Sequence, residues 1–314
     1  MEIKESDIVK SHEVDLTEIL RALWQGKVWI VLLSAVFSIG GVFYALSLPN
    51  EYKATVILSP VEDTQGGMLG GLKSDLGGLA AMAGVNLGGG GSNKSALALQ
   101  ILKSRGFLNE FVEKYDLKAT LMGTNGWDLS SNTLLYNEKV YDDKTGQWLR
   151  EVAAPRTPEP SVQEVYEYIL GKNLSVIEDK KKGLVWFSIT HYSPYVAKDL
   201  VEKLVVEINA RMQKDDIQQA TTKIEYLKKT LAETTVADMH KIFYQLIEQQ
   251  EQTKMLALTQ SQYVFRTIDP AILPEIKDGP KRAFICIGFA FAGLVLSFGF
   301  VLFRYFVMPK TARS

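Results

Sequence analysis

Two long apolar runs, one near each end of the chain, dominate the pattern of hydrophobic and polar positions. Residues 28–48 and 283–303 each contain 21 residues without a charged side chain. A helix of about 20 apolar residues crosses the hydrocarbon core of a bilayer. The pattern therefore predicts transmembrane helices at 28–48 and 282–303. The first run is too long for a signal-peptide core and lacks a clear cleavage site, so we interpret it as an uncleaved anchor.

Short polar segments flank the two runs. Residues 1–27 and 304–314 are expected on one side of the membrane and residues 49–281 on the other. Within the first segment, apolar residues at i, i+3, i+4 and i+7 predict a short amphipathic helix over residues 15–24, along the membrane surface. Basic residues stand close to both sides of the runs, so the positive-inside rule sets the orientation only weakly.

Alternating and β-branched segments between the runs predict strands. The segment after Pro194 is different, because it contains no Gly or Pro until Pro270. Its apolar stripe predicts a long helix over about 195–233, which at 1.5 Å per residue extends roughly 57 Å, followed by a second helix over about 236–260. Such a helix is longer than a compact domain needs and projects from the core. We expect its narrow row of apolar residues to pack against a partner in the same chain or in a copy of it. The expected strands, which can form one mixed sheet, are 52–58, 174–177, 184–190 and 263–268.

Turn and cap residues refine this α+β domain. Asp179 to Gly183 predicts a hairpin, and two short extended pieces surround residues 143–146 within 136–151. Residues 95–117 carry apolar positions in helical register, and Ser161 with Glu164 predicts a capping box. Residues 66–91 include 11 glycines. Their interleaved apolar residues favour a loop or short helix that packs against a neighbour over a pure linker.

Charge and cysteine content exclude several classes of function. The formal net charge is −1, with 35 basic and 36 acidic residues, which argues against a nucleic-acid surface or a funnel for acidic substrates. The single cysteine, Cys286, lies inside the second apolar run. It allows no intramolecular disulfide and no cysteine-based zinc site.

The sequence carries no pattern of a catalytic, cofactor-binding or metal site. The histidines, His12, His191 and His240, are scattered, and no GxSxG motif is present. Residues 88–95 resemble a phosphate loop, but Asn93 replaces the second glycine and no buried strand precedes it. We therefore expect neither enzymatic activity nor a cofactor. Three tryptophans can stack on sugar rings, although packing is the more common role of single tryptophans: Trp127, Trp148 and Trp186.

Small residues within the apolar runs favour close helix contact. Gly40 and Gly41 lie in the first run, and Gly293 and Ser297, four residues apart, form a small-xxx-small pair in the second. Gly288 and Gly299 add further small positions to the second run.

The chain resembles the Wzz family of polysaccharide co-polymerases, the O-antigen chain-length determinants. The family's pattern is roughly PxxPxxxxSPK, eleven residues, then GGMxGAG. Here Pro274, Pro280 and Lys281 match the first part, and Gly293 and Gly299 match the ends of the second. The departures are Pro270, which stands one place early, Gly279 in place of Ser, and Leu294, Val295, Ser297 and Phe298 in place of Gly, Met, Gly and Ala. The segments SALALQILKSRGFLNEFVEKYDL and YVFRTIDPAILPE are also similar to family members.

The resemblance implies a non-enzymatic inner-membrane protein that sets the modal length of O-antigen made by a Wzy-type polymerase. It implies a homo-oligomer with a periplasmic α+β domain that acts on lipid-linked polysaccharide. The chain ends at Ser314, which resembles the class without a kinase domain. Two other functions remain open, namely a capsule or exopolysaccharide export component working with a separate kinase, and a periplasmic sensor. The resemblance marks Pro274, Pro280, Lys281, Gly293, Ser297 and Gly299 as motif and helix-packing residues.

Overall fold

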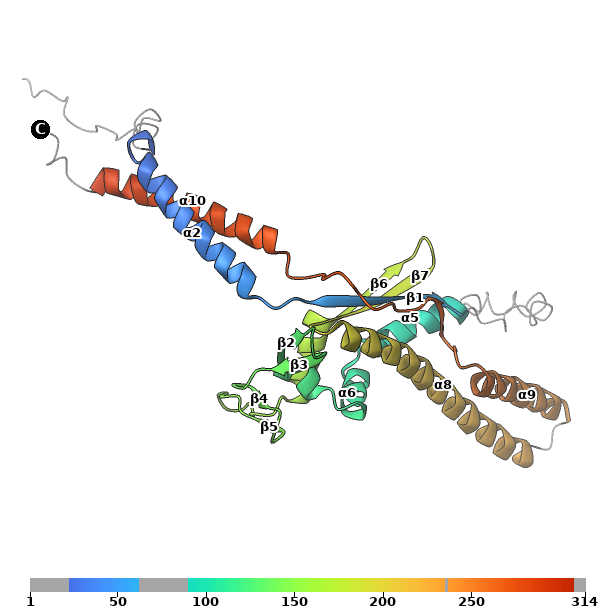
Figure 1. Ribbon diagram of the computed structural model, residues 1–314. Coiled ribbons are helices and arrows are strands. Elements are labelled where there is room, and N and C mark those ends of the chain that lie inside the picture. Colours follow the sequence, from blue (N-terminus) through green and yellow to red (C-terminus); the bar gives the residue numbers. More distant parts are fainter. Residues whose placement is uncertain (1–22, 62–89, 235–236, 308–314) are drawn as a thin grey trace, which may run out of the picture. The chain divides into compact units, whose positions relative to one another are not determined.

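The protein is described by a computed structural model that covers residues 23–61, 90–234 and 237–307 (Figure 1). The chain divides into two units, one built from the two apolar helices and one from residues 50–278. The amphipathic helix predicted over residues 15–24 lies outside the described residues except for its last two positions. The glycine-rich segment 66–91 also lies outside them, apart from its last two residues.

The first unit is a pair of packed helices. Helix α2 spans Lys27–Ser47 and helix α10 spans Arg282–Val307. Both are long and apolar enough to cross a membrane, as the sequence predicts. Helix α10 continues to Val307, four residues past the predicted end at Phe303, and so includes Arg304 and Tyr305, which follow the uncharged run. A helix can extend past the apolar stretch that defines the span.

The second unit contains a four-stranded sheet in the order β6-β7-β1-β8. The four strands are the expected ones, but all three pairings are antiparallel, so the expected mixed sheet is wrong. The reason lies at the ends of the unit. The backbone N–H of Asp278 donates to the carbonyl oxygen of Glu51 at 2.8 Å, so the chain returns to where it started and its last strand runs opposite to its first. The strands are β1 (Tyr52–Pro60), β6 (Leu174–Asp179), β7 (Leu184–His191) and β8 (Phe265–Asp269).

Smaller hairpins complete the strand content. The predicted pieces around residues 143–146 are β4 (Tyr141–Asp142) and β5 (Gln147–Trp148), and a hairpin absent from the prediction pairs β2 (Thr124–Asp128) with β3 (Thr133–Tyr136). Gly183, which ends the turn between β6 and β7, has a φ of +64°. Glycine adopts a positive φ at the lowest cost, so a glycine at the end of a short polar segment between two strands is a strong indication of a hairpin turn.

The helix predicted over residues 95–117 is divided into α5 (Gly90–Leu102) and α6 (Arg105–Lys114). Ser104 starts the second helix, since its side chain accepts the N–H of Phe107 at 3.3 Å. The apolar positions keep the helical spacing across the break, so the spacing alone predicts one continuous helix. The capping box at Ser161 is confirmed and starts α7 (Val162–Tyr168).

Helix α8 (Pro194–Glu233) organises the second unit. Its 40 residues correspond to about 60 Å, close to the length expected from the sequence. The first half packs on the sheet, where Leu200, Leu204 and Ile208 of the helix are buried. The strand residues in this core alternate, as expected for one buried face: Ala54, Val56, Leu58, Val185, Phe187 and Ile189.

The second half of α8 packs against α9 (Ala237–Thr259), the second predicted helix (Figure 1). Ala220 and Ile224 of α8 are buried there. The narrow row of apolar residues therefore has a partner in its own chain. Other large side chains of the hairpin stay exposed, including Tyr226 at 69% and Leu258 at 63%.

A buried asparagine fixes β8 to α8. Asn209 Oδ1 accepts the backbone N–H groups of Val264 and Phe265 at 2.8 and 2.9 Å, and its Nδ2 donates to the carbonyl oxygens of Val205 and Phe265. One side chain thus satisfies backbone groups where the chain enters the sheet edge. The sequence pattern did not single out this residue, because a polar residue beside an apolar stripe ordinarily faces solvent.

His191 is buried at the start of α8. Its Nδ1 accepts the N–H of Ser193, the residue that caps α8, and its Nε2 therefore carries the proton and donates to the carbonyl oxygen of Thr120 at 2.9 Å. Burial lowers the pKa of His191 below its ordinary value of 6.5. The neutral ring is satisfied on both sides, so the imidazole has a structural role here.

We expect the stability of the second unit to fall in mild acid because of His191. In the unfolded state His191 has its ordinary pKa of 6.5, whereas in the folded state its pKa is lower. The contribution of the neutral ring to the free energy of unfolding is therefore complete above pH 6.5 and is lost as the pH falls below it. Urea unfolding of the wild type and of His191→Gln between pH 8 and 5 measures this. The wild type should lose up to about 1.4 kcal/mol more per pH unit than the variant. Parallel pH profiles would contradict the assignment.

Candidate functional site

The two membrane helices meet at small residues. A Cβ added to Gly293 would lie 2.6 Å from Cβ of Phe37 and 3.4 Å from Cα of Ser34, and one added to Gly41 would lie 2.5 Å from Cβ of Phe289. Real Cβ atoms do not approach each other so closely, so each position requires glycine. Ser297 is fully buried. Its hydroxyl lies 3.3 Å from that of Ser34, which adds a polar contact inside the pair.

The other small residues face elsewhere. A Cβ added to Gly40, Gly288 or Gly299 would have no described atom within 4 Å, apart from the nearby backbone of its own helix. The six motif positions are therefore not one cluster. The structure brings together Gly293 and Ser297, whereas Gly299 lies on an open side of α10.

The proline-rich approach spans the boundary between the two units. Pro274 is half-buried in the second unit, and Pro280 and Lys281 precede α10 in the first. The carbonyl oxygen of Lys281 accepts the N–H of Phe284 at 3.0 Å, so Lys281 forms the first turn leading into the helix. Pro280 is suited to this place, because its fixed φ is compatible with a helix start.

Arg282 is a residue that the sequence analysis missed. Its Nη2 donates to the carbonyl oxygen of Leu48 at 3.0 Å, and Leu48 caps the C-terminus of α2. A cation at the carbonyl end of a helix is favourable, because the last carbonyl groups have no partner within the helix. A basic residue directly before an apolar run was the available signal, but it does not reveal the partner.

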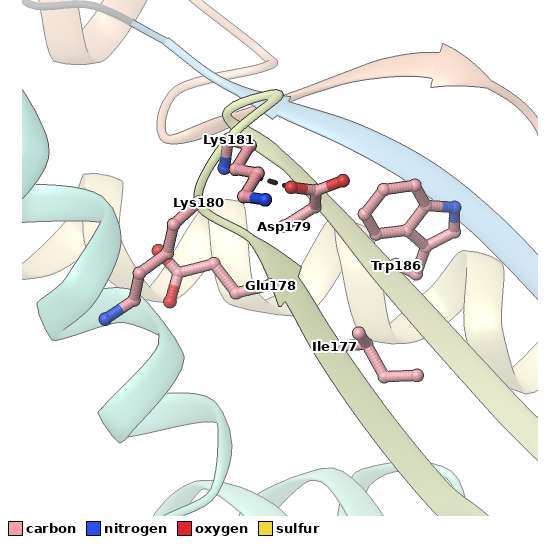
Figure 2. A pocket seen from close by; sticks show the side chains of 6 residues that line it. All are labelled: Ile177, Glu178, Asp179, Lys180, Lys181 and Trp186. Carbon is pink, nitrogen blue, oxygen red and sulfur yellow. Dashed lines mark hydrogen bonds between the residues drawn. The ribbon is translucent and has the colours of Figure 1, made fainter.

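A shallow pocket lies on the β6-β7 hairpin (Figure 2). Figure 2 shows Ile177 and Trp186 side by side along neighbouring strands, with Asp179 nearer the turn. Asp179 Oδ1 accepts the backbone N–H of Lys181 at 2.9 Å, which holds the turn in place. The pocket is lined by Ile177, Glu178, Asp179, Lys180, Lys181 and Trp186.

The other two candidate tryptophans pack against neighbours. The ring of Trp127 lies 5.7 Å from that of Tyr52, and its indole N–H donates to Asn132. Trp148 packs on Tyr141 with ring centroids 5.0 Å apart. Packing is thus the role of these two residues. Trp186 differs, because it lies at a pocket.

Two residues that were considered as candidates for ligand binding, Lys94 and His240, contact other groups of the protein. Lys94, from the segment that resembles a phosphate loop, pairs with Asp216 at 2.8 Å and lies 3.8 Å above the ring of Tyr263. His240 lies 2.7 Å from the carbonyl oxygen of Thr234. Within residues 23–61, 90–234 and 237–307, no group of three or more His, Cys, Asp or Glu side chains could hold a metal ion.

Comparisons with known proteins found a family model and solved structures that are similar to this chain. The family model described as Wzz, chain length determinant protein, matches residues 12–115. A solved full-length bacterial polysaccharide co-polymerase is 14% identical, with a TM-score of 0.39, over 95% of this chain and 100% of that one. A fragment of WzzB, a polysaccharide co-polymerase from Salmonella Typhimurium, is 13% identical, with a TM-score of 0.30, over 73% of this chain and 100% of that one. No curated protein matches the chain.

The family match begins ahead of the first membrane helix and ends at residue 115, directly after α6. It does not include the proline and glycine pattern around α10, but it includes most of the segment 95–117 that also resembles the family. Over residues 12–115, the match supports the resemblance to the Wzz family of chain length determinants.

Proposed function

We propose that the protein is a non-enzymatic regulator of the bacterial inner membrane that sets the modal length of O-antigen in Wzy-dependent lipopolysaccharide biosynthesis. The observation that carries this proposal is the match to the chain length determinant family. The architecture supports it, since a helix of membrane-spanning length stands at each end of a large α+β unit. In this proposal residues 49–281 are periplasmic and both chain ends are cytoplasmic.

The protein would act as a scaffold built from several copies of itself. Helix α8 is about 60 Å long, and its hairpin with α9 retains exposed large side chains after the two helices have packed. Exposed apolar groups on a long hairpin are suited to contacts with a neighbouring copy or with the Wzy-type polymerase. Lipid-linked polysaccharide would be organised on this assembly. Light scattering after mild detergent extraction should give a large homo-oligomer, and a clean monomer would count against the scaffold.

Deletion of the gene tests the function. We expect the deletion strain to keep O-antigen on its surface but to lose the preferred chain length, because polymerisation continues without its regulator. Gel electrophoresis of lipopolysaccharide and whole-cell immunoblotting measure the two quantities separately. Loss of surface polymer instead would support a role in capsule or exopolysaccharide export.

A further inference from the structure

The face of the four-stranded sheet that points away from the core carries one apolar row, with hydroxyl groups on one side of it and a carboxylate on the other. Trp186 of β7 pairs directly with Ile57 of β1 on one side and with Ile177 of β6 on the other. Residues directly opposite each other in antiparallel strands place their side chains on the same face of the sheet. The three side chains therefore form a continuous row across three strands, on the face opposite the core residues Val185 and Phe187.

A row of hydroxyl groups runs beside the apolar row. Ser188 of β7 pairs with Thr55 of β1 and with Ser175 of β6. The hydroxyls of Thr55 and Ser188 lie 2.9 Å apart. Ser188 is buried, so the half-buried Thr55 and Ser175 are the members of this row that a ligand can reach. On the other side of the apolar row, Asp179 stands at the turn of the hairpin, with its carboxylate held by backbone N–H groups. The face thus alternates apolar and hydrogen-bonding strips.

Trp186 is available to a ligand. Its side chain is only half-buried, and Ile177 beside it is 55% exposed. The indole N–H of Trp186 makes no hydrogen bond within the part of the chain that the structure describes. Trp127, in contrast, already uses its N–H on Asn132. A flat ring with a free donor at its edge is suited to a partner that has an apolar face and polar rims.

We propose that this face binds a short stretch of polysaccharide, with one sugar ring stacked on Trp186. A pyranose ring presents C–H groups on its face and hydroxyls around its edge, which complements an aromatic ring between strips of hydroxyl and carboxylate groups. The inference rests on the proposed function, since the polymer is the one whose length the protein regulates. The inference goes beyond that function by naming the surface of the protein that contacts the polymer.

The charges around the row also favour a glycan. Lys180 and Lys181 are exposed directly after Glu178 and Asp179, so both positive and negative groups stand at the hairpin. Such a mixed rim offers both donors and acceptors to hydroxyl groups. A second copy of the chain would need a broad apolar centre, about 800 Å² on each partner. Three side chains in a single row fall far short of that.

Binding is measured with the full-length protein in detergent, with Trp186 as its only tryptophan and the other four replaced by phenylalanine. The probe is O-polysaccharide released by mild acid from the organism's own lipopolysaccharide, and dextran of similar length is the control. We expect a saturable change in Trp186 emission with the O-polysaccharide and none with dextran. No change with the O-polysaccharide would overturn the proposal, as would a change that depends only on protein concentration.

Substitutions sharpen the test by calorimetry on otherwise wild-type protein. Trp186→Ala should weaken O-polysaccharide binding by about tenfold, because it removes the stacking surface. Trp186→Tyr should retain most of the affinity, and Trp148→Ala, in a different hairpin, should leave it unchanged. Equal losses in the Trp186→Ala and Trp148→Ala variants would show that general destabilisation is responsible and would contradict a sugar site at Trp186.

The outcomes separate this inference from the proposed function. A deletion strain whose O-antigen ladder is unchanged refutes the proposed function, whatever Trp186 binds. A strain carrying Trp186→Ala that keeps its preferred chain length, with unchanged polysaccharide binding, refutes only the site. We expect that strain to show an altered preferred length together with reduced binding.

Discussion

Gly293→Leu is expected to push the two membrane helices apart. Even a Cβ at this position would lie 2.6 Å from Cβ of Phe37, and a leucine adds three more carbons to a contact that is already closed. Overpacking of this kind typically costs about 1–3 kcal/mol. Ser34 lies in the same contact and Ser297 lies one turn along α10, so their hydroxyls should separate from the present 3.3 Å.

Disulfide cross-linking measures this separation. In a Cys286→Ser background, cysteines introduced by Ser34→Cys and Ser297→Cys should cross-link within one chain, and Gly293→Leu should reduce that cross-linking severalfold. Gly299→Leu is the matched control, since nothing described lies within 4 Å of a Cβ at Gly299. Equal cross-linking with leucine at position 293 would contradict the close contact. If Gly299→Leu changes O-antigen length while the cross-link persists, Gly299 acts through a neighbouring molecule.

Asn209→Ala is expected to be among the most destabilising substitutions in the second unit. It removes four hydrogen bonds and leaves the backbone N–H groups of Val264 and Phe265 without their acceptor inside the protein. Unsatisfied buried groups cost about 1–3 kcal/mol each, so a total of about 3 kcal/mol is reasonable. For a unit of this size the melting temperature should fall by about 6–12 °C.

Thermal unfolding of the full-length protein in detergent, followed by circular dichroism, tests this expectation. Asn125→Ala provides the control, because Asn125 is exposed on β2. Its melting temperature should stay within about 2 °C of the wild type. A similarly small change for Asn209→Ala would mean that the contact between α8 and β8 is held by apolar packing alone.

Features with a local cause were predictable from the sequence. The long helix α8 was predicted to within a residue at its start, because the segment lacks Gly and Pro and carries a regular apolar stripe. The capping box at Ser161 and the turn ending at Gly183 follow from the chemistry of single residues. Both membrane helices followed from uncharged runs of sufficient length.

Features that depend on distant partners were not predictable in this way. The direction of β8 depends on the return of Asp278 to Glu51, more than 200 residues earlier in the chain. The roles of Asn209 and Arg282 depend on carbonyl and N–H groups that only the fold brings near. The row formed by Ile57, Trp186 and Ile177 likewise exists only through strand register, so the sequence could name the tryptophan but not its surroundings.

Whether the protein sets the preferred chain length can be read directly from the length distribution of O-antigen. It is measured on a gel of lipopolysaccharide from the deletion strain carrying either an empty plasmid or the wild-type gene. We expect a ladder without a preferred length for the empty plasmid, and a restored cluster of bands at one length when the protein is expressed. Identical ladders in the two strains, with the protein present in the membrane, would contradict this expectation.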